Sequence, residues 1–137
     1  MKKMYLLTIA LILLIASGFL FFSRDTDAAN AQFLSSYGIV INSKPVSFEE
    51  IAIPAEFDEM YSQYNMMQIE CGLDLYPVRG KNAVRYTYEI MNMPDGDGKT
   101  VYANVICVRG KPVAGDVTCP SLDGFTKPLN FLSELQD

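Results

Sequence analysis

One uncharged, strongly apolar run near the N-terminus constrains this chain more than any other feature of its sequence. The run extends from Met4 to Phe22 and follows two lysines, Lys2 and Lys3. A helix with a rise of about 1.5 Å per residue would make this run about 28 Å long, close to the roughly 30 Å of bilayer hydrocarbon. The sequence therefore predicts an N-terminal transmembrane helix.

A cationic start followed by an apolar run is also typical of a secretory signal peptide. Residues 1–24 are therefore predicted to be either an uncleaved signal-anchor or a leader cleaved near Ala29-Asn30-Ala31 or Thr26-Asp27-Ala28. The basic residues at the start favour a cytoplasmic N-terminus. Both alternatives place residues 25–137 outside the cytoplasm, in a single-pass protein of the cell membrane or in a secreted protein.

The composition excludes several classes of function. The chain has no histidine, which removes Ser-His and Cys-His nucleophile pairs and histidine-ligated metal sites. All 16 acidic residues follow the apolar run and the formal net charge is −5, so no nucleic-acid partner is expected, because phosphate contacts need a basic surface. We predict neither a cofactor nor a metal.

The three cysteines, Cys71, Cys107 and Cys119, match no zinc or redox spacing. Two interpretations remain open. All three could be small buried hydrophobic residues, or two of them could form one disulfide in an oxidising compartment.

The first elements of the predicted single domain, residues 25–137, are a short helix and a strand pair. Asp27 can cap a helix from Ala28 to Tyr37. The strand pair comprises residues 39–41 and 46–53, with a bulge at Glu49-Glu50 where the apolar phase changes.

The clearest helix is predicted from Pro54 to Cys71, because proline suits the first helical position and Gly72 suits the stop. One of its faces carries a stripe that favours packing against a sheet, with a ligand groove as the alternative. The stripe consists of Phe57, Met60, Tyr61, Tyr64, Met67 and Cys71.

Three further strands are predicted at residues 84–90, 101–108 and 113–119, with a turn at 94–98. Pro112 predicts a loose turn before the last strand, because proline has no N–H to donate. The predicted fold is α+β, with one long helix packed on an antiparallel sheet. The sheet combines a C-terminal three-stranded meander with the N-terminal strand pair, and a short helix and the transmembrane helix precede it.

Several short segments, in this order, resemble a family of small exported proteins of clostridia and related Firmicutes, domain of unknown function 4830. The resemblance covers roughly residues 31–125 and implies an exported single domain; it transfers no activity, ligand or catalytic residue to this chain. It rests on Ser36-Tyr37-Gly38, Ile53-Pro54-Ala55-Glu56-Phe57-Asp58, Tyr61, Tyr64-Asn65, Gly72-Leu73-Asp74-Leu75, Gly80-Lys81, Arg85-Tyr86-Thr87-Tyr88-Glu89 and Leu122-Asp123-Gly124-Phe125.

The candidate site is a cluster of cations. Val78-Arg79-Gly80-Lys81 and Val108-Arg109-Gly110-Lys111 each precede a strand that flanks the same central strand. In an antiparallel meander the two outer strands run parallel, so both segments should meet at one end of the sheet. Arg79, Lys81, Arg109 and Lys111 could then bind an anion, helped by glycine amides. The alternative is solvated side chains, or ion pairs with Glu56, Asp58 and Glu59.

Other motifs are weaker. The segment from Asp95 to Thr100 resembles phosphate and calcium loops but lacks their required residues, so it is interpreted as a turn. A carboxylate pair for acid–base chemistry could be drawn from Glu49, Glu50, Glu89, Asp116 and Asp123, with Glu89 and Asp116 sharing a cleft.

The sequence predicts a membrane-tethered, exported binding or interaction module that is not catalytic and that contacts a protein or an anionic cell-envelope partner. One alternative is a carboxylate-dependent enzyme that acts on an extracellular polymer. The other is a structural subunit of an envelope complex.

Overall fold

The structure is a computed structural model of the chain that describes residues 1–93, 98–121 and 124–137, without the side chains of residues 17–24. Most of the predicted turn at 94–98, and the candidate carboxylate Asp123, lie outside the described residues. In chain order the elements are α1 (Lys2–Ser35), β1 (Ser47–Ala52), α2 (Glu59–Glu70), the 3-10 helix η1 (Tyr76–Val78), β2 (Asn82–Glu89), β3 (Tyr102–Val108), β4 (Lys111–Cys119), β5 (Phe125–Lys127) and α3 (Phe131–Glu134).

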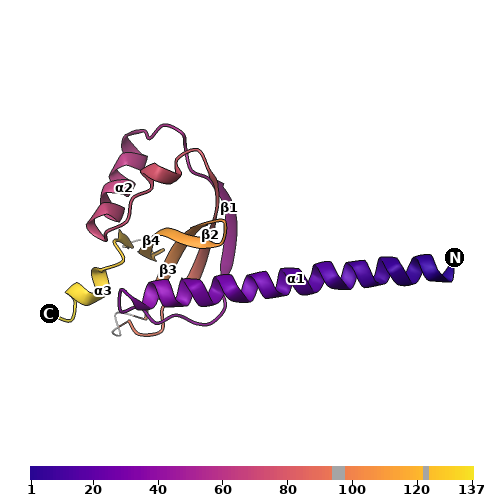
Figure 1. Cartoon of the computed structure of the whole chain (residues 1–137). Coiled ribbons are helices and arrows are strands. Elements are labelled where there is room, and N and C mark those ends of the chain that lie inside the picture. The colour runs from indigo at the N-terminus through magenta and orange to yellow at the C-terminus, as the bar shows by residue number, and fades with distance from the viewer. Residues whose placement is uncertain (94–97, 122–123) are drawn as a thin grey trace.

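The five strands form one antiparallel sheet in the order β1-β2-β3-β4-β5, with α1 and α2 on opposite sides of it (Figure 1). The central strand β3 contributes apolar residues to both faces of the sheet. Val105 and Cys107 belong to the core cluster that contains Leu34 of α1, whereas Ile106 and Val108 belong to the cluster on which the tyrosines of α2 pack. The sheet therefore separates two cores.

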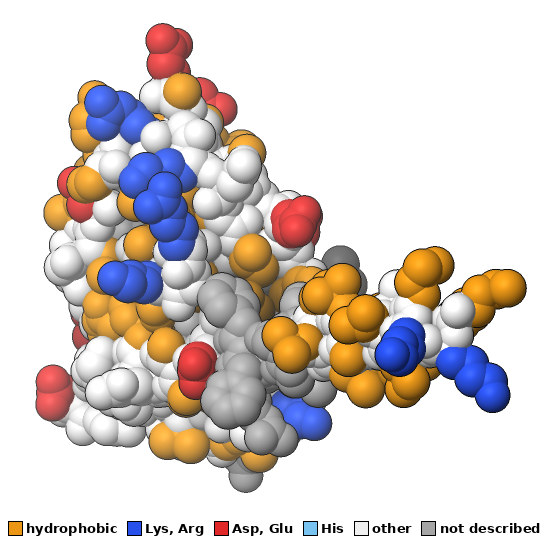
Figure 2. Space-filling model, turned by 45° about the vertical axis from the view of Figure 1, so that its right-hand side comes forward, with side chains coloured by type: hydrophobic (Ala, Val, Ile, Leu, Met, Phe, Trp, Pro, Cys, Tyr) orange, Lys and Arg blue, Asp and Glu red, His pale blue; other side chains and the backbone are white. Residues whose placement is uncertain are grey.

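The N-terminal part of the chain differs from the prediction. A single helix, α1, replaces the predicted transmembrane helix and the separate helix at 28–37. Its second half is part of the domain, because Thr26, Asn30 and Leu34, spaced four residues apart, are buried against the sheet. Its first half projects beyond the sheet and carries exposed apolar side chains (Figures 1 and 2).

Among the residues that the structure describes, no helix combines the length and the apolar character needed to cross a membrane. The predictions of a transmembrane signal-anchor, of membrane contact through the N-terminal helix and of a single-pass cell-membrane location are therefore wrong.

Polar contacts hold the second half of α1 on the sheet. The Tyr88 hydroxyl donates to Asp27 Oδ1 at 2.7 Å, and Asn30 Nδ2 donates to the Tyr88 hydroxyl at 2.9 Å. The thiol of Cys107 donates to Asn30 Oδ1 at 3.1 Å. Asp27 therefore binds a tyrosine on β2 instead of capping a new helix, because α1 runs through this position without a break.

The predicted long helix at 54–71 is also corrected. Helix α2 starts at Glu59, because Asp58 is its N-cap and accepts a hydrogen bond from the Tyr61 backbone N–H at 2.7 Å. The buried residues of α2 are the polar Asn65 and Gln68, while Met60 of the predicted stripe is 80% exposed.

The predicted strand pair does not form. Ile41 makes a single bridge to Ile90, and β1 pairs with β2 in an uninterrupted register, without the bulge predicted at Glu49-Glu50. Strand β1 lies at the edge of the sheet and is exposed along most of its length, so burial does not impose an apolar phase on it.

The turn between β3 and β4 is tighter than predicted. Val108 pairs with Lys111, so only Arg109 and Gly110 form the turn, at φ of 52° and 74°. Pro112 is tolerated because the pair next to the closing pair of such a hairpin exchanges no hydrogen bonds, so its missing N–H costs the β3–β4 ladder nothing. Beyond this pair, the register of β3 with β4 shifts between Cys107 and Ile106.

Candidate functional site

The four predicted anion-binding residues lie near one end of the sheet, where β2 and β4 begin and β3 ends. Arg79, Lys81, Arg109 and Lys111 are all exposed. The Arg79 guanidinium lies 4.2 Å from the centre of the Tyr76 ring and donates to the Tyr76 carbonyl. Within the described part of the chain, Arg85–Glu49 is the one ion pair, so the alternative pairing with Glu56, Asp58 and Glu59 is not seen. Anion binding here stays a prediction.

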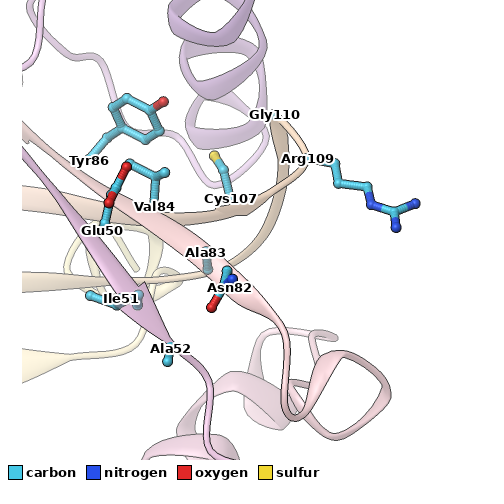
Figure 3. Close-up of a pocket in the computed structure, with 10 residues that line it drawn as sticks. All are labelled: Glu50, Ile51, Ala52, Asn82, Ala83, Val84, Tyr86, Cys107, Arg109 and Gly110. Carbon is cyan, nitrogen blue, oxygen red and sulfur yellow. The ribbon is translucent and has the colours of Figure 1, made fainter.

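A cavity of about 570 Å³ lies near the same end of the sheet, on its α1 side (Figure 3). Glu50, Tyr86 and Cys107 line it from three neighbouring strands. The Arg109 side chain points away from the cavity (Figure 3). Burial raises the pKa of the Cys107 thiol to about 12, so this sulfur stays protonated and is a poor nucleophile. The cavity therefore does not gather the predicted cations.

A larger groove, of about 800 Å³, lies between α2 and the half of the sheet that α2 leaves open. Helix α2 forms one wall with Met60, Tyr61 and Tyr64. The other lining residues are Val46, Ser47, Ile51, Ala52, Arg85, Thr87, Tyr102, Asn104, Ile106, Asp116, Thr118, Pro120 and Thr126. The groove combines aromatic and aliphatic walls with a polar floor, which is the usual composition of a ligand site.

The floor of the groove is a row of polar side chains that lie directly opposite one another on four strands. This polar row is Ser47, Thr87, Asn104 and Asp116. Thr87 Oγ1 donates to Asn104 Oδ1 at 2.7 Å, and Asn104 Nδ2 donates to Asp116 Oδ1 at 2.8 Å. From α2, the Tyr64 hydroxyl donates to Asp116 Oδ2 at 2.7 Å. The hydrogen bonds therefore converge on one carboxylate.

Asp116 is only 5% exposed. Burial raises the pKa of its carboxyl group, and the hydrogen bonds from Asn104 and Tyr64, together with the charge of Arg85, oppose this shift only in part. Burial and the neighbouring Asp116 also raise the pKa of Tyr64 far above neutrality, so the tyrosine remains a donor.

Two polar residues of α2 set the position of the groove wall. Gln68 bridges the backbone of Gly115 on β4, accepting from its N–H and donating to its carbonyl, both at 2.9 Å. Asn65 accepts from the Leu75 N–H at 2.7 Å and donates to Asp74. A Cβ atom at Gly115 would lie 2.6 Å from the Asn104 carbonyl oxygen, so the close packing behind the floor requires glycine.

The residues of this groove were only partly predicted. Asp116 lines it, but Glu89, its predicted partner in a shared cleft, does not. Of the helical stripe, Met60, Tyr61 and Tyr64 line the groove, and the alternative that the stripe binds a ligand stays a prediction. Thr87 and Asn104 were missed. The available signal was a polar residue in the middle of an apolar strand, which is costly unless it is paired.

Comparison of the chain with family models, curated proteins and solved structures finds no match. The resemblance to the family of domain of unknown function 4830 therefore remains a prediction.

Proposed function

We propose that this protein is a binding module without catalytic activity, and that the groove between α2 and the open half of the sheet is its ligand site. The observation that carries the proposal is the polar row that ends at the buried Asp116 on the groove floor. A buried carboxylate is costly, and its position in a groove with a shifted pKa is typical of functional sites.

The rival function, a carboxylate-dependent enzyme, has less support. Asp116 is the single carboxylate among the described residues that line the groove. Acid–base catalysis of polymer cleavage usually needs two carboxyl groups in different environments. Tyr64 is a poor base because it stays protonated near neutrality.

Chemical-shift mapping tests the proposed function. Labelled protein is titrated with a lysine-containing peptide, a neutral oligosaccharide and polyglutamate. We expect at least one of them to shift the backbone amides of Thr87, Asn104 and Thr118, and Tyr64→Phe to weaken that binding while Tyr76→Phe, at an exposed ring outside the groove, does not. The proposal is wrong if no ligand shifts these amides. Shifts confined to Lys81 and residues 109–111 would instead favour the cation cluster.

A further inference from the structure

We propose that the groove selects an aliphatic cation, an ammonium or guanidinium group on a hydrocarbon stem, with Asp116 as its counter-ion. Lysine and arginine side chains of a partner protein carry such groups, and so do free polyamines. The inference rests on the proposed function and names the chemistry of its ligand.

The direction of the hydrogen bonds in the polar row favours a ligand that donates. Thr87 donates to Asn104, and Asn104 and Tyr64 both donate to Asp116. An ionised carboxylate has about four acceptor positions, and these two bonds use two of them. The protein therefore directs its own donors along the row, and the acceptor capacity that remains at Asp116 suits a ligand that donates.

The distribution of charge around the groove favours a cationic ligand. Among the described residues, the charged ones that line the groove are Asp116 and Arg85. The Arg85 guanidinium already forms an ion pair, because it donates to Glu49 at 2.6 Å on the surface of the sheet. The negative charge of Asp116 is therefore only partly balanced, and a cationic ligand would supply the missing charge. An anion would add a second negative charge to the same place.

The walls of the groove favour a ligand with a hydrocarbon stem. Met60 and Ile51 offer aliphatic contacts, and Tyr61, Tyr64 and Tyr102 offer aromatic rings around the floor. Hydrocarbon stems pack on such surfaces, and cations are attracted to aromatic faces within about 6 Å.

The test compares Nα-acetyl-lysine methylamide and Nα-acetyl-arginine methylamide with the uncharged Nα-acetyl-norleucine methylamide on the unmodified protein. The readout is the shift of the Thr87, Asn104 and Thr118 amides. We expect the charged probes to bind about tenfold or more tightly than the norleucine probe, as for a charge-assisted hydrogen bond. Asp116→Asn should abolish this preference. Glu50→Gln, the same change of charge at an exposed residue outside the groove, should leave it unchanged.

Equal binding of the norleucine probe, or an undiminished preference in Asp116→Asn, would overturn the inference. So would groove shifts with the oligosaccharide or polyglutamate but not with the charged probes, a result that leaves the proposed function intact. The comparison of probes needs no variant, so it remains decisive if Asp116→Asn fails to fold. Spermidine, titrated in parallel, distinguishes a free polyamine from a side chain of a partner protein as the source of the cation. Tighter binding of spermidine than of the lysine probe would indicate a polyamine, and tighter binding of the lysine probe would indicate a side chain.

Discussion

Asp116 links the stability of the domain to pH. Folding removes this carboxyl group from water and raises its pKa above the ordinary value of 3.8. A carboxyl group with a raised folded-state pKa adds stability while it is protonated, and this contribution is lost as the pH rises through the folded-state pKa. Above the folded-state pKa of this group the domain therefore carries the cost of a buried charge.

Asp116→Asn removes this titration. We expect the free energy of unfolding of the unmodified protein, measured relative to Asp116→Asn, to be highest near pH 3 and to fall as the pH rises toward 7. Urea unfolding of both proteins across this range measures the difference. Glu50→Gln is the control, because that side chain is exposed. A difference that is constant or increases with pH would contradict the assignment.

Among the described residues, Arg109 is the one non-glycine residue with a positive φ, 52°. It lies in a turn type that favours Asn-Gly. We expect Arg109→Asn to raise the free energy of unfolding by about 0.5 to 1 kcal/mol, since asparagine tolerates this backbone region better. Chemical denaturation measures the change. Arg109→Lys keeps both the charge and the strain, so it should leave stability nearly unchanged, and an equal gain in both variants would refute the explanation.

At the scale of elements, Gln68 joins α2 to the sheet through two hydrogen bonds to Gly115. Gln68→Ala leaves a buried backbone N–H and carbonyl without these partners. We expect a loss of about 2 to 3 kcal/mol of unfolding free energy, together with faster hydrogen exchange of the Gly115 amide. The matched control is Gln63→Ala, on the same helix at an exposed position. Equal effects of the two changes would mean that helix propensity, not the bridge, is responsible.

The elements also show what the sequence could predict. Patterns along the chain, alternation at 84–90 and a continuous apolar run at 101–108 among them, located β2, β3 and β4 to within two residues at each end, because burial on the faces of a sheet dictates side-chain type. Strand β1 was predicted with a bulge, since an exposed edge places little demand on pattern. The start of α2 was misplaced because Pro54 is compatible with a first helical turn, whereas the Asp58 side chain provides the actual cap.

The site was harder to predict than the strands. Meander geometry correctly brought the starts of β2 and β4 to one end of the sheet, near which the cation cluster lies. The polar row depends on the register of three strand pairings at once, and the Tyr64 contact depends also on the placement of α2. No local pattern contains that information.

At the scale of the whole molecule, the three cysteines are free thiols, so the alternative of one disulfide is wrong. The three thiols differ in how deeply they are buried. Cys107 and Cys119 are buried, whereas Cys71 is partly exposed.

We expect a thiol reagent at neutral pH to modify Cys71 first in the native protein, and Cys107 and Cys119 only on unfolding. Mass spectrometry of peptides after timed labelling measures the order. Cys71→Ser should remove the fast phase alone. Fast labelling of Cys107 in the native protein would contradict the packing of α1 on the sheet.

The open edge of the sheet has one further consequence. If two copies of β1 met side by side in antiparallel fashion about Glu49 or about Glu50, that glutamate of one copy would lie opposite the same glutamate of the other. Like charges directly across from each other oppose such growth. These two glutamates thus oppose edge-to-edge association, and replacing both with glutamine would remove the repulsion beside the exposed Phe48 and Val46.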